Sequence, residues 1–267
     1  MITGIVSLQL MQFFMNVDSV SGTFGTMKKI AQIMDTDSEP DGGEPVPEVC
    51  ADIEFDNVSF AYAGGQDVIK NLSVKIPMGK VTAVIGGNGA GKSTLFKLLL
   101  HLYEPKSGEI RFGGDGIGKY SLTDWRDRFA VVPQRNPLIG GTVRENIAYG
   151  LDREVSDEEL AETARRANFS GGQGQFISIA RAMLRNADYL LLDEATSNLD
   201  VVSEAEVTGA MDELMRDKTT IMIAHNYAAT RNADYIIVMK DGAVEAAGTP
   251  DELLKTNEYY KMFVKTL

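Results

Sequence analysis

Residues 86–94 read Gly86-Gly87-Asn88-Gly89-Ala90-Gly91-Lys92-Ser93-Thr94 and lie between two apolar runs, 81–85 and 95–102. The first run is short and continuous, as in a buried strand, and the second is typical of a helix. Glycines let the backbone N–H groups of a loop point inward, and the following helix presents its positive end. We expect this loop to wrap the phosphates of a nucleotide, with Lys92 on the β and γ phosphates and the Ser93 hydroxyl on Mg²⁺.

Short apolar runs alternate with helical segments along the remaining chain, which is typical of a mainly parallel sheet covered by helices. We therefore expect an α/β fold built on a P-loop NTPase core. The runs that predict strands buried on both faces are 81–85, 129–132, 189–192, 220–224 and 235–239. Thr249, Pro250 and Glu252 mark the start of a last helix that continues to the C-terminus.

Two regions differ from this alternation. Apolar residues over 53–62 indicate a first strand pair, and alternation over 72–76 precedes a turn, which together predict an antiparallel β subdomain. Between 141 and 186 the β signals vanish, and Ser156 with Glu159 forms a capping-box pattern at a helix start. We expect a helical lobe at 141–186.

The N-terminal part of the chain predicts a helix and a linker. Residues 1–17 carry no charge but are barely long enough to span a bilayer, and apolar residues then recur at helical spacing to residue 34. We interpret 1–34 as the end of a helix that descends from a membrane region; packing on its own domain is the alternative. Residues 35–51 contain three prolines and six acidic side chains, so they predict an acidic linker before a domain at 52–267.

Composition excludes several classes of protein. The formal charge of −12 argues against a surface that coats nucleic acid, because phosphate backbones attract clustered Lys and Arg. Cys50 is the only cysteine, and His101 and His225 are far apart, so neither a disulfide framework nor a His/Cys zinc site is expected. Such a composition suits a reducing cytoplasm.

The apolar run 189–192 ends in two carboxylates, Asp193 and Glu194. Parallel strands deliver the side chains at their carboxyl ends to a ligand crevice. Asp193 is placed to hold Mg²⁺ indirectly, and Glu194 to accept a proton from, or to orient, the water that attacks the γ phosphate. The alternative is a solvated turn.

Residues 169–173, Phe-Ser-Gly-Gly-Gln, resemble the signature motif of ATP-binding cassette (ABC) proteins, and the other motifs of that family are present in order. The resemblance implies that adenine stacks on Tyr62. It also implies that Gln134 touches Mg²⁺ and water and that His225 contacts the γ phosphate. Asp200, in Ser-Asn-Leu-Asp, matches the loop that crosses to a partner cassette. Strand packing for Tyr62 and a surface turn for His225 are the alternatives.

These observations define three sets of candidate residues. The candidate catalytic residues are Lys92, Gln134, Glu194 and His225. The candidate Mg²⁺ ligands are Ser93, Gln134 and Asp193. The candidate nucleotide-binding residues are Tyr62, Gly86, Gly87, Asn88, Gly89, Ala90, Gly91, Lys92, Ser93, Thr94, Gln134, Ser170, Gly171, Gly172, Gln173 and Asp200.

The resemblance covers about residue 53 to the C-terminus, and the preceding helix and linker are similar to the junction in exporters that fuse membrane and ATPase domains. In this family the signature motif is remote from its own phosphate loop and serves the ATP of a second cassette. The resemblance thus implies a head-to-tail pair of identical or different cassettes. It further implies ATP and Mg²⁺ as ligands, a transmembrane domain as partner, no nucleic acid, and a place at the cytoplasmic face of the cell membrane.

The chain departs from the family pattern at three places. Phe169 follows Asn168 directly, where the family has a further helix and a loop. Either this part of the helical lobe was lost, or the two residues are not neighbours in the native chain, which we favour. Met1 similarly begins in mid-helix. Gly174 and Phe176 occupy positions that are usually basic, and we expect this change to weaken ATP contacts or the signature helix.

Three functions are compatible with these features. The first is an ATP-driven module of an exporter, the second a soluble ABC ATPase acting on DNA or ribosomes, and the third a nucleotide-gated module with little turnover. The apolar N-terminal helix and the negative charge count against the second, and Glu194 and His225 count against the third. A small-molecule kinase would leave residues 170–173 without a role. We therefore predict an ATP-hydrolysing exporter cassette.

Overall fold

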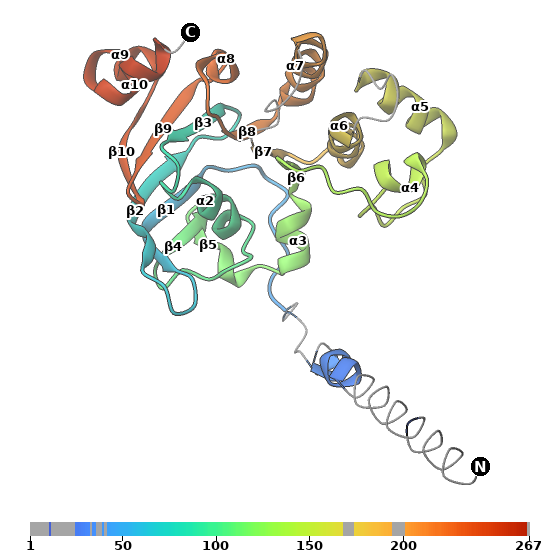
Figure 1. Cartoon of the computed structure of the whole chain (residues 1–267). Coiled ribbons are helices and arrows are strands. Elements are labelled where there is room, and N and C mark those ends of the chain that lie inside the picture. Colours follow the sequence, from blue (N-terminus) through green and yellow to red (C-terminus); the bar gives the residue numbers. More distant parts are fainter. Residues whose placement is uncertain are drawn as a thin grey trace, which may run out of the picture. The chain divides into compact units, whose positions relative to one another are not determined.

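The computed structural model describes residues 11, 25–32, 34–35, 39, 42–167, 174–193 and 201–265 (Figure 1). The chain divides into two compact units, 1–41 and 42–267. In the first unit, residues 25–32 and 34 are helical, and the side chains of Met27, Ile30 and Met34 are exposed. Most of the helix expected over 1–34 lies outside the described residues. Within the described ranges, no helix combines the length and apolar character needed to cross a membrane.

Six strands of the second unit form a mainly parallel sheet in the order β10-β9-β3-β8-β7-β6. All neighbouring pairs are parallel except β9 and β10. The strands are β3 (Val81–Gly86), β6 (Phe129–Val132), β7 (Tyr189–Asp193), β8 (Thr219–Ile223), β9 (Tyr235–Lys240) and β10 (Ala243–Gly248). The predicted α/β fold is therefore confirmed. The sequence does not predict β10, because its alanine- and glycine-rich residues have low strand propensity.

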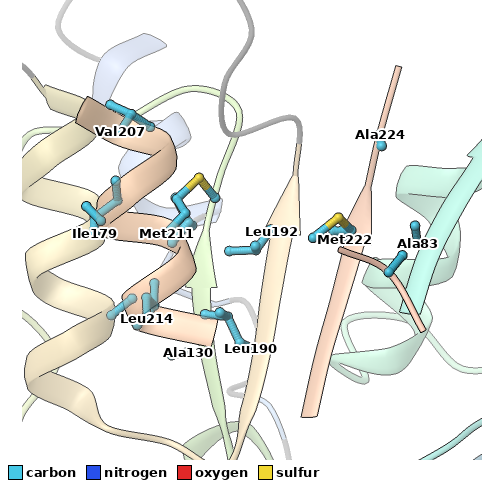
Figure 2. Packing of buried hydrophobic residues seen from close by; sticks show 14 of the residues in the cluster. Ala83, Ala130, Ile179, Leu190, Leu192, Val207, Met211, Leu214, Met222 and Ala224 are labelled. Atoms are coloured by element: carbon cyan, nitrogen blue, oxygen red, sulfur yellow. The ribbon is translucent and has the colours of Figure 1, made fainter. Parts of the chain in front are cut away.

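Both faces of this sheet are buried, because successive strand residues point to opposite sides. Leu190 and Leu192 of β7 belong to a core covered by α6 (Gly174–Arg185) and α7 (Val201–Met215). Figure 2 shows Met211 and Leu214 of α7 on the side of the sheet that Leu190 and Leu192 face. Leu191 instead belongs to the second core, with α2 (Lys92–Leu99), α3 (Leu122–Asp127) and the antiparallel sheet.

The second sheet is antiparallel, with the strand order β2-β1-β4-β5. Its strands are β1 (Ile53–Ala61), β2 (Asp67–Ile76), β4 (Ser107–Phe112) and β5 (Asp115–Gly116), followed by the 3₁₀ turn η1 (Ile117–Lys119). Residues 53–61 form a single strand, so the expected strand pair was wrong. Register shifts near Val58 and a positive φ of 50° at Asn57 explain why the apolar alternation is interrupted there.

The helical lobe contains α4 (Val143–Ile147), α5 (Asp157–Arg166) and α6 within its described residues. Ser156 caps α5 by accepting a hydrogen bond from the Glu159 N–H at 3.1 Å. The reciprocal half of the expected capping box is not formed, because the Glu159 carboxylate binds the Arg153 guanidinium at 2.6 and 2.8 Å. A complete capping box instead begins α4, at Thr142 and Glu145.

Two helices, α9 (Pro250–Thr256) and α10 (Glu258–Val264), follow α8 (Tyr227–Thr230) and β10 where we expected one. Thr249 and Glu252 form the expected capping box at the start of α9. Asn257 then interrupts the helix and accepts a hydrogen bond from the Tyr260 N–H at 2.7 Å. Asparagine is favoured at an N-cap over a helix interior, which accounts for the break.

Residues 42–51, which we expected to belong to the linker 35–51, lie within the compact second unit. The Glu44 N–H donates to the carbonyl oxygen of Lys119 at 2.8 Å, and the Ser121 N–H donates to the carbonyl oxygen of Glu44 at 2.9 Å. This stretch of backbone is thus hydrogen-bonded to the domain, although its prolines and acidic side chains are typical of a linker.

Candidate nucleotide-binding site

The loop between β3 and α2 has the close backbone approach that a phosphate cradle needs. Gly86 and Gly91 have φ values of 151° and 101°, which side chains rarely adopt. A Cβ on Gly86 would lie 2.2 Å from the Met239 carbonyl oxygen, and one on Gly91 would lie 2.7 Å from Ile69 Cδ1. The glycines therefore let the loop bend tightly against β9 and β2.

Lys92 is the first residue of α2 and is 6% exposed. Its Nζ donates to the carbonyl oxygens of Gly86 at 2.8 Å and Gly87 at 3.1 Å, so the ammonium lies inside the bend of the loop. Residues 88–94 line a pocket of about 220 Å³ together with Val68 and His225. A positive charge beside the N-terminus of a helix favours an anionic ligand. The Ser93 side chain is exposed beside Lys92, where its hydroxyl can ligate a cation. These residues fit a Mg-nucleotide.

Tyr62, directly after β1, belongs to an aromatic group beside this pocket. Its hydroxyl lies 3.1 Å from the Thr94 hydroxyl and accepts a hydrogen bond from Lys97 Nζ at 3.3 Å. The Lys97 ammonium also lies 5.3 Å from the centre of the Tyr62 ring. The rings of Phe60 and Tyr103 lie 5.0 and 5.3 Å from it, both edge to face. Tyr62 is thereby joined to the phosphate-loop helix.

The other described candidates follow neighbouring strands of the parallel sheet. Asp193 is the last residue of β7 and is half-buried, and Gln134 comes two residues after β6 and is exposed. His225 comes two residues after β8 and lines the pocket with the phosphate loop. Because the sheet order is β3-β8-β7-β6, the carboxyl ends of these strands lie along one edge. The fold thus brings these three residues and the phosphate loop to the same edge of the sheet.

Several candidates lie outside the described residues. They are Ser170, Gly171, Gly172, Gln173, Glu194 and Asp200, together with the junction between Asn168 and Phe169. Helix α6 begins at Gly174, directly after the signature-like stretch, and β7 ends at Asp193, directly before Glu194. The roles of these residues stay predictions.

Phe176 lies in the hydrophobic core, and Gly174 lies close to Asn136. Phe176 is 1% exposed and packs in the core that contains α6 and α7. A Cβ on Gly174 would lie 3.2 Å from the Cβ of Asn136. The Asn136 side-chain amide also donates a short hydrogen bond to Gln175 Oε1. The apolar residue at 176 is therefore a core residue, and the segment after Gln134 is tied to the start of α6.

Sequence reasoning missed Val68, Lys97 and Tyr103. Val68 reaches the pocket from β2, and Tyr103 reaches Tyr62 from the segment after α2. A valine in a strand and a tyrosine in a loop have no chemical signature of their own. Only Lys97 could have been expected near the site, because it lies on α2 five residues after Lys92.

Comparisons with known proteins point to one family. Residues 69–197 match the model of the ABC transporter family. The chain is 38% identical over 258 aligned residues to the ATP-dependent lipid A-core flippase of Escherichia coli strain K12, with 87% of this chain and 44% of the flippase covered. The flippase of Salmonella paratyphi A is also 38% identical, over 257 residues, with the same coverage. A bacterial Atm1-family ABC exporter with ATP bound has a TM-score of 0.79 and 29% identity, covering 89% of this chain and 46% of that one.

The fold and the pocket define a P-loop nucleotide-binding domain. The chain belongs to the ABC transporter family, and its domain is an exporter-type ATPase cassette. It spans less than half the length of the curated relatives it matches. Coverage of 87% of 267 residues is about 232 residues, which is about 26 fewer than the 258 aligned positions. The flippase therefore has positions in the aligned region for which this chain has no residue.

Proposed function

We propose that this cassette binds and hydrolyses ATP to power an exporter, and that ATP draws two cassettes together. The observation that carries the proposal is the pocket shared by Lys92 and His225, which follow the neighbouring strands β3 and β8, with Asp193 at the end of the next strand. Because the carboxyl ends of these strands are neighbours, Lys92, His225 and Asp193 would all lie around one bound triphosphate. The similarity of the chain to a solved ABC exporter with ATP bound supports the proposal.

Each residue has a distinct proposed role. Lys92 and the loop N–H groups bind the β and γ phosphates, and Tyr62 stacks on adenine. Ser93, Gln134 and Asp193 are the groups that would hold Mg²⁺, which neutralises phosphate charge when bound. Glu194 accepts a proton from the water that attacks the γ phosphorus, and His225 contacts the γ phosphate.

The second cassette would complete the nucleotide site. Ser170, Gly171, Gly172 and Gln173 would contact the ATP of the partner, and Asp200 would lie in the loop that crosses to it. The position of this stretch immediately before α6 in the sequence is compatible with the assignment. Charge-assisted contacts to two shared nucleotides would drive closure of a head-to-tail pair.

An exposed apolar patch supports a membrane domain as partner. Leu138, Ile139, Val143 and Tyr149 are 38–56% exposed, and they lie in and around α4. Asn146, which is 3% exposed, holds this surface: its amide bonds the Ile139 N–H and the Ile139 and Thr142 carbonyls at 2.9–3.0 Å. Exposed apolar residues close together on a charged domain are suited to binding another protein. We propose that it docks on the transmembrane domain at the cytoplasmic face of the membrane.

This chain has fewer residues than the flippase in the region where the two are aligned, which is relevant to the junction between Asn168 and Phe169. We propose that the aligned positions without a residue in this chain fall there, because the family has a helix and a loop at that point. Sequencing the native transcript across this junction tests the idea. A continuous message that joins the two codons would contradict our preference for residues that are not neighbours in the native chain.

The function is tested with Glu194→Gln in the full chain. We expect MgATP binding to persist, the hydrolysis rate to fall at least about a hundredfold, and a dimer to accumulate on size exclusion with ATP. Glu258→Gln is the matched control, because Glu258 is exposed, lies in α10 and is far along the chain from every candidate site residue. Hydrolysis by Glu194→Gln at the parental rate would show that the assigned base is wrong.

A further inference from the structure

Residues 43–51 are here called the strap. The C-terminal part of the strap is hydrogen-bonded to residues at the starts of β6 and β7. Arg128, the residue before β6, donates from Nη2 to the carbonyl oxygens of Pro47 at 2.6 Å and Val49 at 3.2 Å. Its Nη1 lies 2.8 Å from a carboxylate oxygen of Asp188, the residue before β7. The Arg128 guanidinium therefore joins the strap to the starts of both strands.

Tyr189, the first residue of β7, makes the second attachment. Its hydroxyl donates to the Ala51 carbonyl oxygen at 2.6 Å and accepts a hydrogen bond from the Ala51 N–H at 2.9 Å. The residue is 0% exposed, and its ring lies 5.9 Å from Phe112 and 5.4 Å from Phe129. Burial raises the pKa of Tyr189 to about 12, so the hydroxyl remains a donor at physiological pH. Packing holds the ring in place, and both hydrogen bonds of its hydroxyl go to one residue of the strap.

The opposite ends of these strands lead into the nucleotide site. β6 ends two residues before Gln134, and β7 ends at Asp193. The strands are hydrogen-bonded in register, from Phe129 opposite Tyr189 to Val132 opposite Leu192. A strand of five residues is about 15 Å long, and one ladder of hydrogen bonds joins β6 and β7 along this length. A short continuous element therefore links Tyr189 to Asp193.

We propose that Tyr189 is a positioning residue through which the strap 43–51 sets the placement of Asp193 and Gln134 against the nucleotide. The proposal rests on the proposed roles of these two residues in ATP hydrolysis. The strap continues along the chain into residues 1–41, so the attachment would couple that unit to the reaction. Coupling is reciprocal, and nucleotide binding therefore also changes how tightly the strap is held.

The experiment compares the full chain with Tyr189→Phe, which keeps the buried ring and removes only the hydroxyl. Tyr235→Phe is the control: Tyr235 is likewise the first residue of a parallel strand, β9, and within the described part of the chain its hydroxyl makes no hydrogen bond. Hydrogen exchange of residues 44–51 is measured with and without MgATP, and kcat and KM are measured for ATP hydrolysis. Thermal unfolding verifies that both variants fold.

In Tyr189→Phe we expect the Ala51 amide to exchange at least about fivefold faster, because it loses its hydrogen-bond acceptor. We also expect kcat to fall about threefold or more while KM changes by less than about twofold, since the phosphate loop is untouched. MgATP should alter exchange of the strap in the parental chain more than in Tyr189→Phe. Tyr235→Phe should match the parental chain in every readout.

Two outcomes would overturn the proposal. One is exchange of the strap in Tyr189→Phe that equals the control, and the other is faster exchange with an unchanged kcat, which would make the attachment purely structural. A parental chain that hydrolyses no ATP would instead contradict the proposed function. In that case the effect of MgATP on strap exchange still decides the inference, because it requires only nucleotide binding.

Discussion

The hydroxyl of Tyr62 lies 3.1 Å from the hydroxyl of Thr94, so the antiparallel sheet is joined to the helix that begins at the phosphate loop. Tyr62 belongs to the subdomain formed by β1, and Thr94 lies on α2, which follows a strand of the parallel sheet. The rings of Phe60 and Tyr103 also pack on the Tyr62 ring, so its position does not depend on the hydroxyl alone. Because adenine would stack on the ring, we expect the ring to matter more than the hydroxyl for nucleotide binding.

Replacing Tyr62 with alanine should weaken MgATP binding about threefold to tenfold, because ring stacking is worth about 0.5–1.5 kcal/mol. Tyr62→Phe keeps the ring and should remain within about twofold of the parental affinity. Isothermal titration with MgATP measures both variants, and titration with Mg-tripolyphosphate, which lacks adenine, should show no difference among them. Equal MgATP affinity for Tyr62→Ala and the parental chain would remove Tyr62 from the adenine site.

Lys92→Ala should lose at least about a hundredfold in MgATP affinity, since two or more charge-assisted hydrogen bonds to phosphate disappear. Lys255→Ala is the control: Lys255 is also a lysine of a helix, but it is exposed and lies on α9, far along the chain from every candidate site residue. We expect that control within about threefold of the parental affinity. Fluorescence titration with a labelled ATP measures the affinities. Binding by Lys92→Ala at the level of the control would show that Lys92 does not bind the phosphates.

Phe176→Ala should lower the free energy of unfolding by about 3–5 kcal/mol, because a fully buried aromatic side chain leaves a cavity. Leu138→Ala, at an exposed position of the same lobe, should change it by less than about 0.5 kcal/mol. Urea unfolding followed by circular dichroism gives both values. A change below about 1 kcal/mol for Phe176→Ala would mean that the residue is not part of the core. Phe176→Arg, which restores the usual basic residue, should be destabilising for the same reason, with a buried charge added.

The raised pKa of Tyr189 predicts a specific loss of stability at high pH. Burial favours the neutral phenol in the folded chain, with a pKa of about 12, while the unfolded chain has the ordinary value near 10. The stabilisation is therefore fully present below pH 10 and is lost as the pH rises from about 10 to 12. Relative to Tyr189→Phe, the parental chain should lose up to about 2–3 kcal/mol of unfolding free energy over this window. Denaturant unfolding at pH 9 and above measures the difference, and a difference that is independent of pH would contradict the buried phenol.

The central parallel strands and the position of the phosphate loop were predictable because their signals are local. The run 81–85 followed by glycines and Lys92 indicates strand, loop and helix from neighbouring residues alone, and the structure places them so. The predictions failed where a few residues decided between close alternatives. The positive φ at Asn57 interrupts the apolar alternation of β1 but does not end the strand. The side-chain amide of Asn257 caps α10 and so divides the expected last helix into two.

The linear order of residues alone determined that this protein has a phosphate loop, an acidic strand end and a signature-like segment, because each depends on side chains within a few positions of one another. Long-range packing decided that Val68 lines the pocket, that Phe176 is a core residue and that Tyr189 binds Ala51. Ala51 and Tyr189 are 138 positions apart, and a hydrogen bond over that separation has no periodicity or motif in the sequence. It exists only because the sheet brings the start of β7 beside the strap.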